Sequence, residues 1–250
     1  MEAFAIEGLP EIRPGDDLSA LIGDRIEFED GDVLCLASTV ASKAEGRKAD
    51  LSAFPPSERA KSIATRLESI TGEPKDPRFA QAVIEESEEL LTEAPFLLAV
   101  TRFGHITVNA GIDRSNVPGA DLLLLPEDPT ASADRLAAEL DVPVVVTDTS
   151  GRPFRYGQRG VAIGWSGLPA ARDWRGEPDR DGRALGVTVQ AVVDELAATA
   201  NLVGGEGDGG TPAVVIRGWE FGDHGASEEL FRRESDDIVR KALREWEFDE

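Results

Sequence analysis

The 250-residue chain is strongly acidic, with 48 aspartate and glutamate residues against 26 lysine and arginine residues and a formal net charge of −22. A surface this negative repels nucleic acid and anionic membranes, so neither is an expected partner. Hydrophobic residues make up 41% of the chain, which excludes a disordered protein and suffices for a sizeable core. No run approaches 18 apolar residues and the N-terminus has no signal-peptide pattern, so we expect a cytoplasmic protein.

The basic residues are unevenly chosen, because 21 of the 26 are arginine and only five are lysine. Acid spread along the whole chain, with few lysines, resembles the composition of halophilic proteins. At about 1 M salt the Debye length is roughly 3 Å, which screens the repulsion between these charges. An acidic interaction surface is the competing interpretation, but the acids form no single block. Cys35 is the only cysteine and is expected to be a small core residue.

Apolar runs bounded by Gly, Pro or Asp predict strands, and apolar residues spaced three and four apart predict helices. In chain order we expect a strand at 32–38, a helix capped by Ser57, a helix carrying Phe79, Ala82, Val83, Leu90 and Leu91, strands at 96–102, 105–109 and 121–125, a helix at 130–140, strands at 143–147 and 160–165, a helix at 187–203, a strand at 212–217 and a helix at 227–246. The strands on either side of Phe103-Gly104 predict an antiparallel hairpin. The span 167–183, rich in Gly, Pro, Arg and Asp, is expected to be a long loop.

These elements are mixed without a regular strand–helix–strand repeat. The pattern therefore favours an α+β fold, with mixed or antiparallel sheets and packed helices, over a doubly wound parallel sheet.

Three acidic loops are the candidate chemical sites. Asp113 and Asp148 each follow a strongly apolar run, and Glu206 and Asp208 lie in a glycine-rich loop at 204–210. Carboxylate, amide and hydroxyl oxygens at rigid strand ends are the ligands that Mg²⁺ or Mn²⁺ needs to hold nucleotide phosphates. Each aspartate could instead be an ordinary turn or cap residue, but together with Glu206 they favour a metal site.

Other residues are weaker candidates. The segment from Ser38 to Lys43 could bring hydroxyls and an ammonium to phosphate, although Lys43 could equally be an ordinary exposed lysine. The glycine-rich loop lacks the G-K-[ST] of a P-loop, and a helix end followed by a turn explains it equally well. Arg152 and Arg155 could clamp an anionic substrate or be surface arginines. The two histidines lack metal-ligand spacing and are expected to be structural or exposed, and no Ser-His-Asp or Cys-His arrangement is suggested.

Six segments together carry a family resemblance, at 7–10, 31–33, 38–46, 108–116, 147–152 and 205–209. The most specific are the strings N-A-G-I-D-x-S-N, from Asn109 to Asn116, and T-D-T-x-G-R, from Thr147 to Arg152. In these motifs, and in their order along the chain, the sequence resembles the coenzyme F420-0:L-glutamate ligase family. The resemblance runs from about residue 5 to about residue 240, and the halophilic composition agrees with a coenzyme at home in archaea.

The resemblance implies a ligase that uses GTP to join L-glutamate to coenzyme F420-0 and then adds a further glutamate through a γ-linkage. It also implies an intertwined homodimer with a two-part subunit, and residues 1–250 as a single catalytic unit that can divide into two subdomains.

Site residues follow from the same resemblance. It implies that Asp113, Asp148, Thr149 and Glu206 hold divalent metal, expected as two Mg²⁺ or Mn²⁺ ions, with K⁺ as a further candidate. Arg152 and Arg155 remain candidates for substrate binding. The residues implied to surround GTP are Gly8, Leu9, Pro10, Glu11, Ser38, Thr39, Lys43, Asn116, Gly204, Gly205, Glu206, Gly207, Asp208, Gly209, Gly210 and Thr211.

The chemistry agrees with this site. A carboxylate is a poor acyl donor, so amide formation needs activation, most simply as an acyl phosphate made with the γ-phosphoryl group of GTP. Phosphoryl transfer depends on bound metals and on positioning of the substrates more than on a nucleophile of the protein. The sequence singles out no residue as catalytic. Two other functions stay open: a metal-dependent phosphohydrolase and a non-catalytic nucleotide-binding protein.

Overall fold

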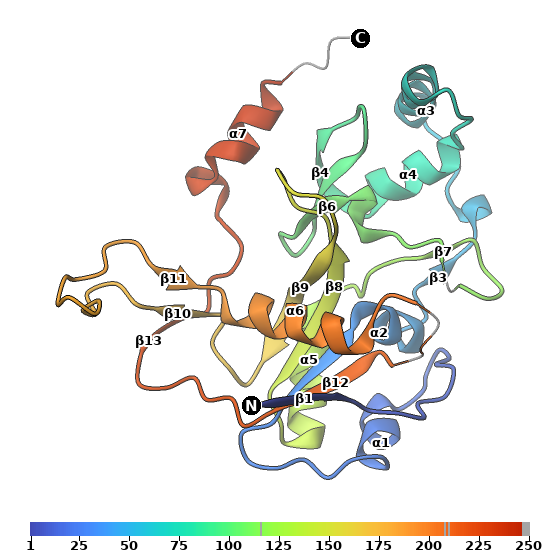
Figure 1. Ribbon diagram of the computed structural model, residues 1–250. Coiled ribbons are helices and arrows are strands. Elements are labelled where there is room, and N and C mark those ends of the chain that lie inside the picture. Colours follow the sequence, from blue (N-terminus) through green and yellow to red (C-terminus); the bar gives the residue numbers. More distant parts are fainter. Residues whose placement is uncertain (116, 208, 210, 247–250) are drawn as a thin grey trace. The chain divides into compact units, whose positions relative to one another are not determined.

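The computed structural model describes residues 1–115, 117–207, 209 and 211–246. The chain divides into two compact units, the first formed by residues 1–45 and 126–230 and the second by residues 46–125 and 231 onward. Figure 1 shows the elements of both units. Each unit is therefore built from two separate stretches of chain.

A five-stranded sheet is the centre of the first unit, with strand order β1-β12-β2-β8-β9. Its strands are β1 (Glu2–Ala5), β12 (Ala213–Arg217), β2 (Val33–Ala37), β8 (Val144–Ser150) and β9 (Arg159–Ser166). Within this sheet only β2 and β8 run parallel, and the other neighbours are antiparallel. The predicted α+β class with mixed sheets is confirmed.

The central strands are buried on both faces, which explains their continuous apolar runs. Residues 33–36 of β2 and 144–146 of β8 are all buried. An antiparallel strand with one wet face alternates apolar and polar residues, whereas a strand covered on both sides does not. Cys35 lies among these residues, 1% exposed, and burial raises the pKa of its thiol to about 12. Its predicted place in the core is confirmed.

Helices cover both faces of this sheet (Figure 1). The helix α6 (Val192–Gly204) packs on the face that includes Cys35 and Val145, and α5 (Pro129–Leu140) contacts β8 and β9 from the other side. Two glycines of β9 allow the close approach. A Cβ on Gly160 would lie 2.3 Å from a carbonyl oxygen of α6, and one on Gly164 would lie 2.4 Å from the backbone of α5. The unit also contains the short helices α1 (Leu18–Gly23) and α2 (Ser38–Ala44).

One strand of a small antiparallel sheet lies in the span 167–183 that was expected to be a long loop. Its strands are β10 (Ala171–Asp173), β11 (Val189–Gln190) and β13 (Gly225–Ser227), in the order β11-β10-β13. The guanidinium carbon of Arg172 lies 5.1 to 5.7 Å from the ring centres of Trp174, Trp219 and Phe221. These cation–π contacts join segments that are far apart in the sequence, which is why local patterns did not reveal the sheet.

The second unit packs helices against short sheets. Its helices are α3 (Glu58–Thr71), α4 (Pro77–Glu85) and α7 (Ile238–Arg244), with 3₁₀ turns η1 (Leu51–Ala53), η2 (Asn109–Gly111) and η3 (Glu234–Asp236). Its strands are β3 (Lys48–Ala49) paired with β7 (Leu122–Leu123), and β4 (Ser87–Thr92), β5 (Leu98–Thr101) and β6 (Ile106–Val108). The buried residues Ile63, Val83, Leu97 and Leu122 belong to its core. Ser57 caps α3 and accepts from the amide of Ala60, as predicted.

Three helix predictions were wrong in extent. The helix with Phe79 ends at Glu85, and Leu90 and Leu91 lie in β4 instead. The glutamates that follow are unfavourable at the negative end of a helix dipole, so the chain turns into a strand there. The helix expected over 187–203 begins only at Val192, after β11.

The helix expected over 227–246 is reduced to α7. Asp237 starts it by accepting hydrogen bonds from the amides of Val239 and Arg240.

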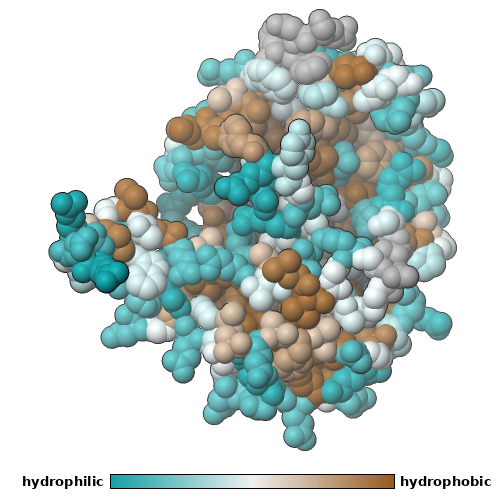
Figure 2. All heavy atoms as spheres, in the orientation of Figure 1, coloured by the Kyte–Doolittle hydropathy of each residue, from teal (hydrophilic) through white to brown (hydrophobic). Residues whose placement is uncertain are grey.

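Within the described residues, no helix is both long and apolar enough to cross a membrane. Hydrophilic residues cover much of the face drawn in Figure 2, as the composition predicts.

Candidate active site

Strand order brings several of the predicted segments to one end of the five-stranded sheet. Ala5 near the end of β1 pairs with Val214 near the start of β12, and Ala37 at the end of β2 pairs with Thr147 of β8. The amide of Ala37 also donates to the carbonyl of Pro212, at 2.8 Å. The predicted residues at 8–11, 38–43, 148–149 and 204–211 therefore leave or enter the sheet at the same end.

Two hydrogen-bonded groups form where β8 reaches this end. Neighbouring residues of a strand point to opposite faces, so Asp148 and Thr149 contact different segments. Asp148 accepts a hydrogen bond from Ser38 Oγ, at 3.3 Å between the oxygens. Thr149 Oγ1 donates a hydrogen bond to Glu206 Oε1 at 3.0 Å, and the side-chain Nδ2 of Asn201 donates one to the same oxygen at 2.6 Å. The structure thus joins Ser38 to Asp148, and Thr149 to Glu206.

Asn201 contacts a candidate site residue, and the sequence analysis did not single it out. It lies in the last turn of α6, and it positions the Glu206 carboxylate five residues later. Its position in the apolar helical pattern gave no local signal of this role, because the contact depends on how the chain turns after the helix. The turn itself was predictable from its glycines.

This turn depends on two glycines. Gly205 has φ +71° and donates its amide to the carbonyl of Asn201 at 2.9 Å, a backbone conformation that favours glycine. The carbonyl of Gly204 accepts from Thr211 Oγ1 at 2.9 Å, and a Cβ on Gly204 would lie 2.7 Å from the Thr211 carbonyl oxygen. Asp208 and Gly210, both predicted to surround GTP, lie outside the described residues.

Lys43 is paired rather than freely exposed. Its ammonium lies 2.7 Å from Glu11 Oε1, and its side chain is 11% exposed whereas that of Glu11 is 56% exposed. Both residues belong to segments predicted to surround the nucleotide. Gly8, which lies in the same N-terminal segment, accepts a hydrogen bond from Arg25 Nε at 2.9 Å.

Asp113 belongs to the second unit, whereas Asp148, Thr149 and Glu206 belong to the first. It lies after β6 and the η2 turn, and its Oδ1 accepts from the amide and hydroxyl of Ser115, at 2.7 and 2.8 Å. Asn116, the other predicted residue of this segment, lies outside the described residues. Asp148 and Thr149 lie within β8 rather than in a loop after it, because the strand continues to Ser150.

Arg152 and Arg155 lie in the exposed loop that connects β8 to β9. No hydrogen bond or ion pair of either guanidinium occurs among the described residues. By contrast, Arg159 at the start of β9 forms an ion pair with Asp194 of α6, with 3.6 Å between the guanidinium nitrogen and the carboxylate oxygen. Burial raises the pKa of the Asp194 carboxyl, while the amide of Ala162 and Arg159 oppose this shift.

Both histidines have structural surroundings, as expected. His105 is 7% exposed and packs against Phe231, with ring centres 5.9 Å apart. Burial lowers its pKa to about 4, so the ring is neutral at neutral pH. His224 Nδ1 lies 2.7 Å from Glu177 Oε1, and its ring lies against Trp174. Neither contacts the groups at the end of β8.

The donor chemistry at the end of β8 suits a hard divalent cation. Asp148 and Glu206 supply carboxylates, Ser38 and Thr149 supply hydroxyls, and Asn201 supplies an amide, which are oxygen-bearing groups of the kind that Mg²⁺ and Mn²⁺ prefer. Within the described part of the chain, however, no three His, Cys, Asp or Glu side chains come together in a ready metal cluster. The first unit alone thus provides hydrogen-bonded carboxylates rather than a closed cage.

Comparison with known proteins finds relatives that are similar along most or all of the chain. The model of the F420-0:Gamma-glutamyl ligase family matches residues 8–218. The chain is 80% identical over 249 residues to the coenzyme F420:L-glutamate ligase of Natronomonas pharaonis, covering 100% of this chain and 98% of that protein. It is 52% identical to the enzyme of that name from Archaeoglobus fulgidus, with 98% of each covered, and 44% identical to the one from Methanosarcina mazei, with 97% and 96% covered.

Proposed function

This chain belongs to the F420-0:gamma-glutamyl ligase family, and we propose that it uses GTP to join L-glutamate to coenzyme F420-0. Membership of the family makes it a ligase that adds glutamate in the biosynthesis of coenzyme F420. We further propose that a second glutamate is added through a γ-linkage. The observation that carries the proposal is the gathering of four motif segments, at 7–10, 38–46, 147–152 and 205–209, at one end of the sheet in the first unit.

The nucleotide site is proposed at this end of the sheet. Backbone amides of glycine-rich turns can approach phosphate closely, and the Lys43 ammonium can bind it as a point charge. In the structure the Lys43 ammonium is paired with the Glu11 carboxylate at 2.7 Å. To bind phosphate, Lys43 would therefore have to exchange this carboxylate for phosphate oxygens. The family motifs also assign Asn116, Asp208 and Gly210 to GTP; these three lie outside the described residues, and for them the proposal rests on the resemblance alone.

Divalent metal is proposed to be held by Asp148, Thr149 and Glu206 of the first unit. The family motifs also assign a metal-binding role to Asp113, which belongs to the second unit, and for that residue the proposal rests on the resemblance alone. The oxygen donors fit Mg²⁺ or Mn²⁺, and K⁺ is a further candidate for the same region. When bound, the divalent ions supply charge neutralisation for the phosphoryl group in transfer. The chain's own part is positioning: Asn201 and Thr149 hold Glu206 by hydrogen bonds, and Ser38 holds Asp148.

The proposed reaction proceeds through an acyl phosphate. The terminal carboxylate of F420-0 attacks the γ-phosphorus of GTP, which releases GDP and leaves an acyl phosphate. The glutamate amine then attacks the acyl carbon, expels phosphate, and loses a proton as the amide forms. Both steps need alignment and charge stabilisation but no covalent attachment to the protein, which agrees with a site of carboxylates, hydroxyls and glycines. We propose that the enzyme is cytoplasmic and a homodimer.

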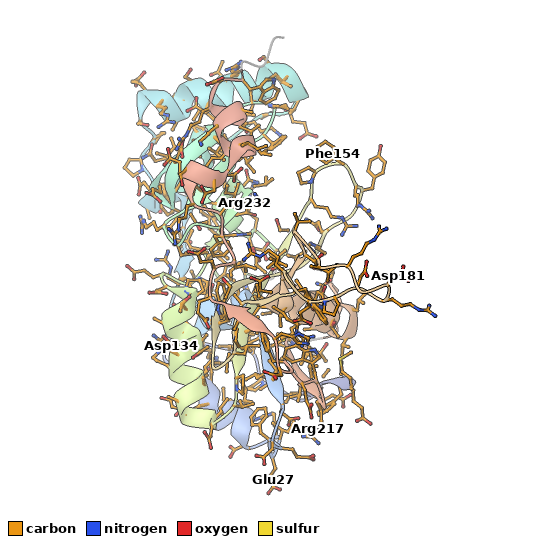
Figure 3. The ribbon with its side chains drawn as sticks, turned by 90° about the vertical axis from the view of Figure 1, so that its left-hand side faces the viewer. Glu27, Asp134, Phe154, Asp181, Arg217 and Arg232 are labelled. Atoms are coloured by element: carbon orange, nitrogen blue, oxygen red, sulfur yellow. The ribbon has the colours of Figure 1, made fainter. Side chains whose placement is uncertain are left out.

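Replacement of Asp148 by alanine tests the site. We expect Asp148→Ala to abolish GTP-dependent glutamate addition while the melting temperature stays close to that of the unchanged protein. The matched control is Asp134→Ala, because Asp134 is an exposed carboxylate on α5 (Figure 3). Full activity of Asp148→Ala would contradict the metal-site assignment.

The same assay separates the other functions. Phosphate release from GTP at full rate without glutamate would favour a phosphohydrolase. Nucleotide binding in molar KCl without any turnover would favour a non-catalytic binding protein.

A further inference from the structure

The longest acid-free stretch of this acidic chain lies between Asp148 and Asp173. It contains Arg152, Arg155, Arg159 and Arg172 and no Asp or Glu, whereas the chain as a whole carries 48 acidic residues in 250. Its first part is the loop of residues 151–158, which we term the arginine–aromatic loop. The loop therefore offers local positive charge on a protein whose net charge is −22.

The side chains of this loop are fully available to a ligand. Every residue from 151 to 158 is exposed, and Phe154 and Tyr156 are as exposed as in an extended chain, at 105% and 104%. Figure 3 shows Phe154 on this loop, standing clear of the strands that the loop connects. Among the described residues, the guanidinium groups of Arg152 and Arg155 have no hydrogen-bond or ion-pair partner.

The combination is specific in its chemistry. Aromatic rings in water gain free energy by stacking on another planar ring, and arginine guanidinium groups bind phosphate and carboxylate in a planar, two-pronged manner. Two exposed rings beside two unpaired guanidinium groups thus fit a ligand that is both planar and anionic. The loop begins directly after Thr149 and Ser150 of β8, so it is adjacent in the chain to the candidate site at the end of that strand.

We propose that the arginine–aromatic loop binds coenzyme F420-0, with Phe154 and Tyr156 against the deazaflavin ring and Arg152 and Arg155 on its phosphodiester. This inference rests on the proposed function for the identity of the ligand. GTP is also planar and anionic, but the segments proposed to bind it within the first unit are those at 8–11, 38–43 and 204–211, and the loop shares no residue with them. F420-0 would enter with its ring on the loop and its carboxylate toward Asp148 and Thr149.

Two double variants test the proposal. Phe154→Ala with Tyr156→Ala removes both rings, and Arg152→Gln with Arg155→Gln removes both charges. The matched controls are Val187→Ala, which removes an apolar side chain that is 89% exposed, and Arg180→Gln, which removes an exposed guanidinium in the loop between β10 and β11. The fluorescence of F420-0 is titrated with each protein in molar KCl, and KM for F420-0 and for GTP is measured separately.

We expect the aromatic pair to weaken F420-0 binding and raise its KM by about tenfold or more, given two lost stacking contacts. The arginine pair should do the same, while KM for GTP and both controls stay unchanged. Unchanged F420-0 binding in both double variants would overturn the proposal, as would a raised KM for GTP alone. Light scattering reports a third outcome, because loss of dimers in the aromatic variant, with F420-0 binding unchanged, would assign the rings to a second copy of the chain.

The titration also separates this inference from the proposed function. Wild-type protein that binds F420-0 but adds no glutamate would refute the ligase and leave the loop assignment to be judged by the variants. Wild-type protein that does not bind F420-0 at all would overturn the loop assignment directly.

Discussion

The close contact between β9 and α6 at Gly160 makes a quantitative prediction. A Cβ at this position would lie 2.3 Å from the carbonyl oxygen of Ala197 and 2.8 Å from the Cβ of Asn201. Ordinary van der Waals contact begins near 3.4 Å, so α6 would have to withdraw by about 1 Å in Gly160→Ala. The obstructing atoms belong to helix backbone and Cβ, which cannot rotate away as a flexible side chain would.

The expected cost can be stated from this overlap. Overpacking a tightly packed site costs about 1–3 kcal/mol, and a contact with helix backbone belongs at the upper end of that range. For a chain of this length, about 2–3 kcal/mol corresponds to a fall in melting temperature of roughly 4–12 °C. Activity should fall as well, because α6 carries Asn201, which holds Glu206 in the site.

Thermal unfolding in molar KCl measures the first effect and steady-state ligation the second. Gly186→Ala is the matched control, since a Cβ there would meet nothing within 4 Å. We expect the control to melt within about 1 °C of the unchanged protein, consistent with the small effect of ordinary surface substitutions. A Gly160→Ala protein with unchanged melting temperature and activity would refute the reasoning that this glycine sets the distance between β9 and α6.

Two further predictions concern charge. Because burial lowers the His105 pKa to about 4 from 6.5, the unfolded chain takes up a proton on this ring below pH 6.5 while the folded protein does not. This group should therefore lower the free energy of unfolding by about 3 kcal/mol from pH 6.5 to 4, measured by urea titration; an equally steep pH dependence in His105→Leu would contradict it. In Glu11→Gln, Lys43 loses its carboxylate partner, so KM for GTP should fall by about two- to fivefold relative to the Glu139→Gln control, which removes an exposed carboxylate on α5. A large increase would show instead that Glu11 positions Lys43 for binding.

Local sequence patterns predicted two kinds of element: strands that are buried along their whole length, and helices whose capping residue is a sequence neighbour. The apolar runs of β2 and β8 identified two central strands, and Ser57 identified the start of α3. The strand β1 and the small sheet around Arg172 were missed, because they depend on pairing between segments that are distant in the sequence. The helix expected through Leu90 and Leu91 failed for a different reason, since apolar spacing alone does not show where consecutive glutamates end a helix.

The site was predictable in its residue types and less so in its geometry. The family segments at 147–152 and 205–209 singled out Asp148, Thr149 and Glu206 as candidates, and their metal-binding role stays a prediction. Only the structure shows that Thr149 and Glu206 share a hydrogen bond while Asp148 accepts one from Ser38. Asn201 had no sequence signal, because its contact with Glu206 is set by the turn after α6. The partnership of Lys43 with Glu11 likewise depends on the strand order that brings two distant segments together.

The most direct test of the central claim is an end-point assay by mass spectrometry. Purified protein is incubated in molar KCl with F420-0, L-glutamate, GTP and Mn²⁺, and the mass of the coenzyme is measured. The account predicts that the coenzyme gains the mass of one or two glutamyl units, and that this gain requires GTP and does not occur when EDTA is present. Folded protein that leaves the mass of F420-0 unchanged under these conditions would contradict it.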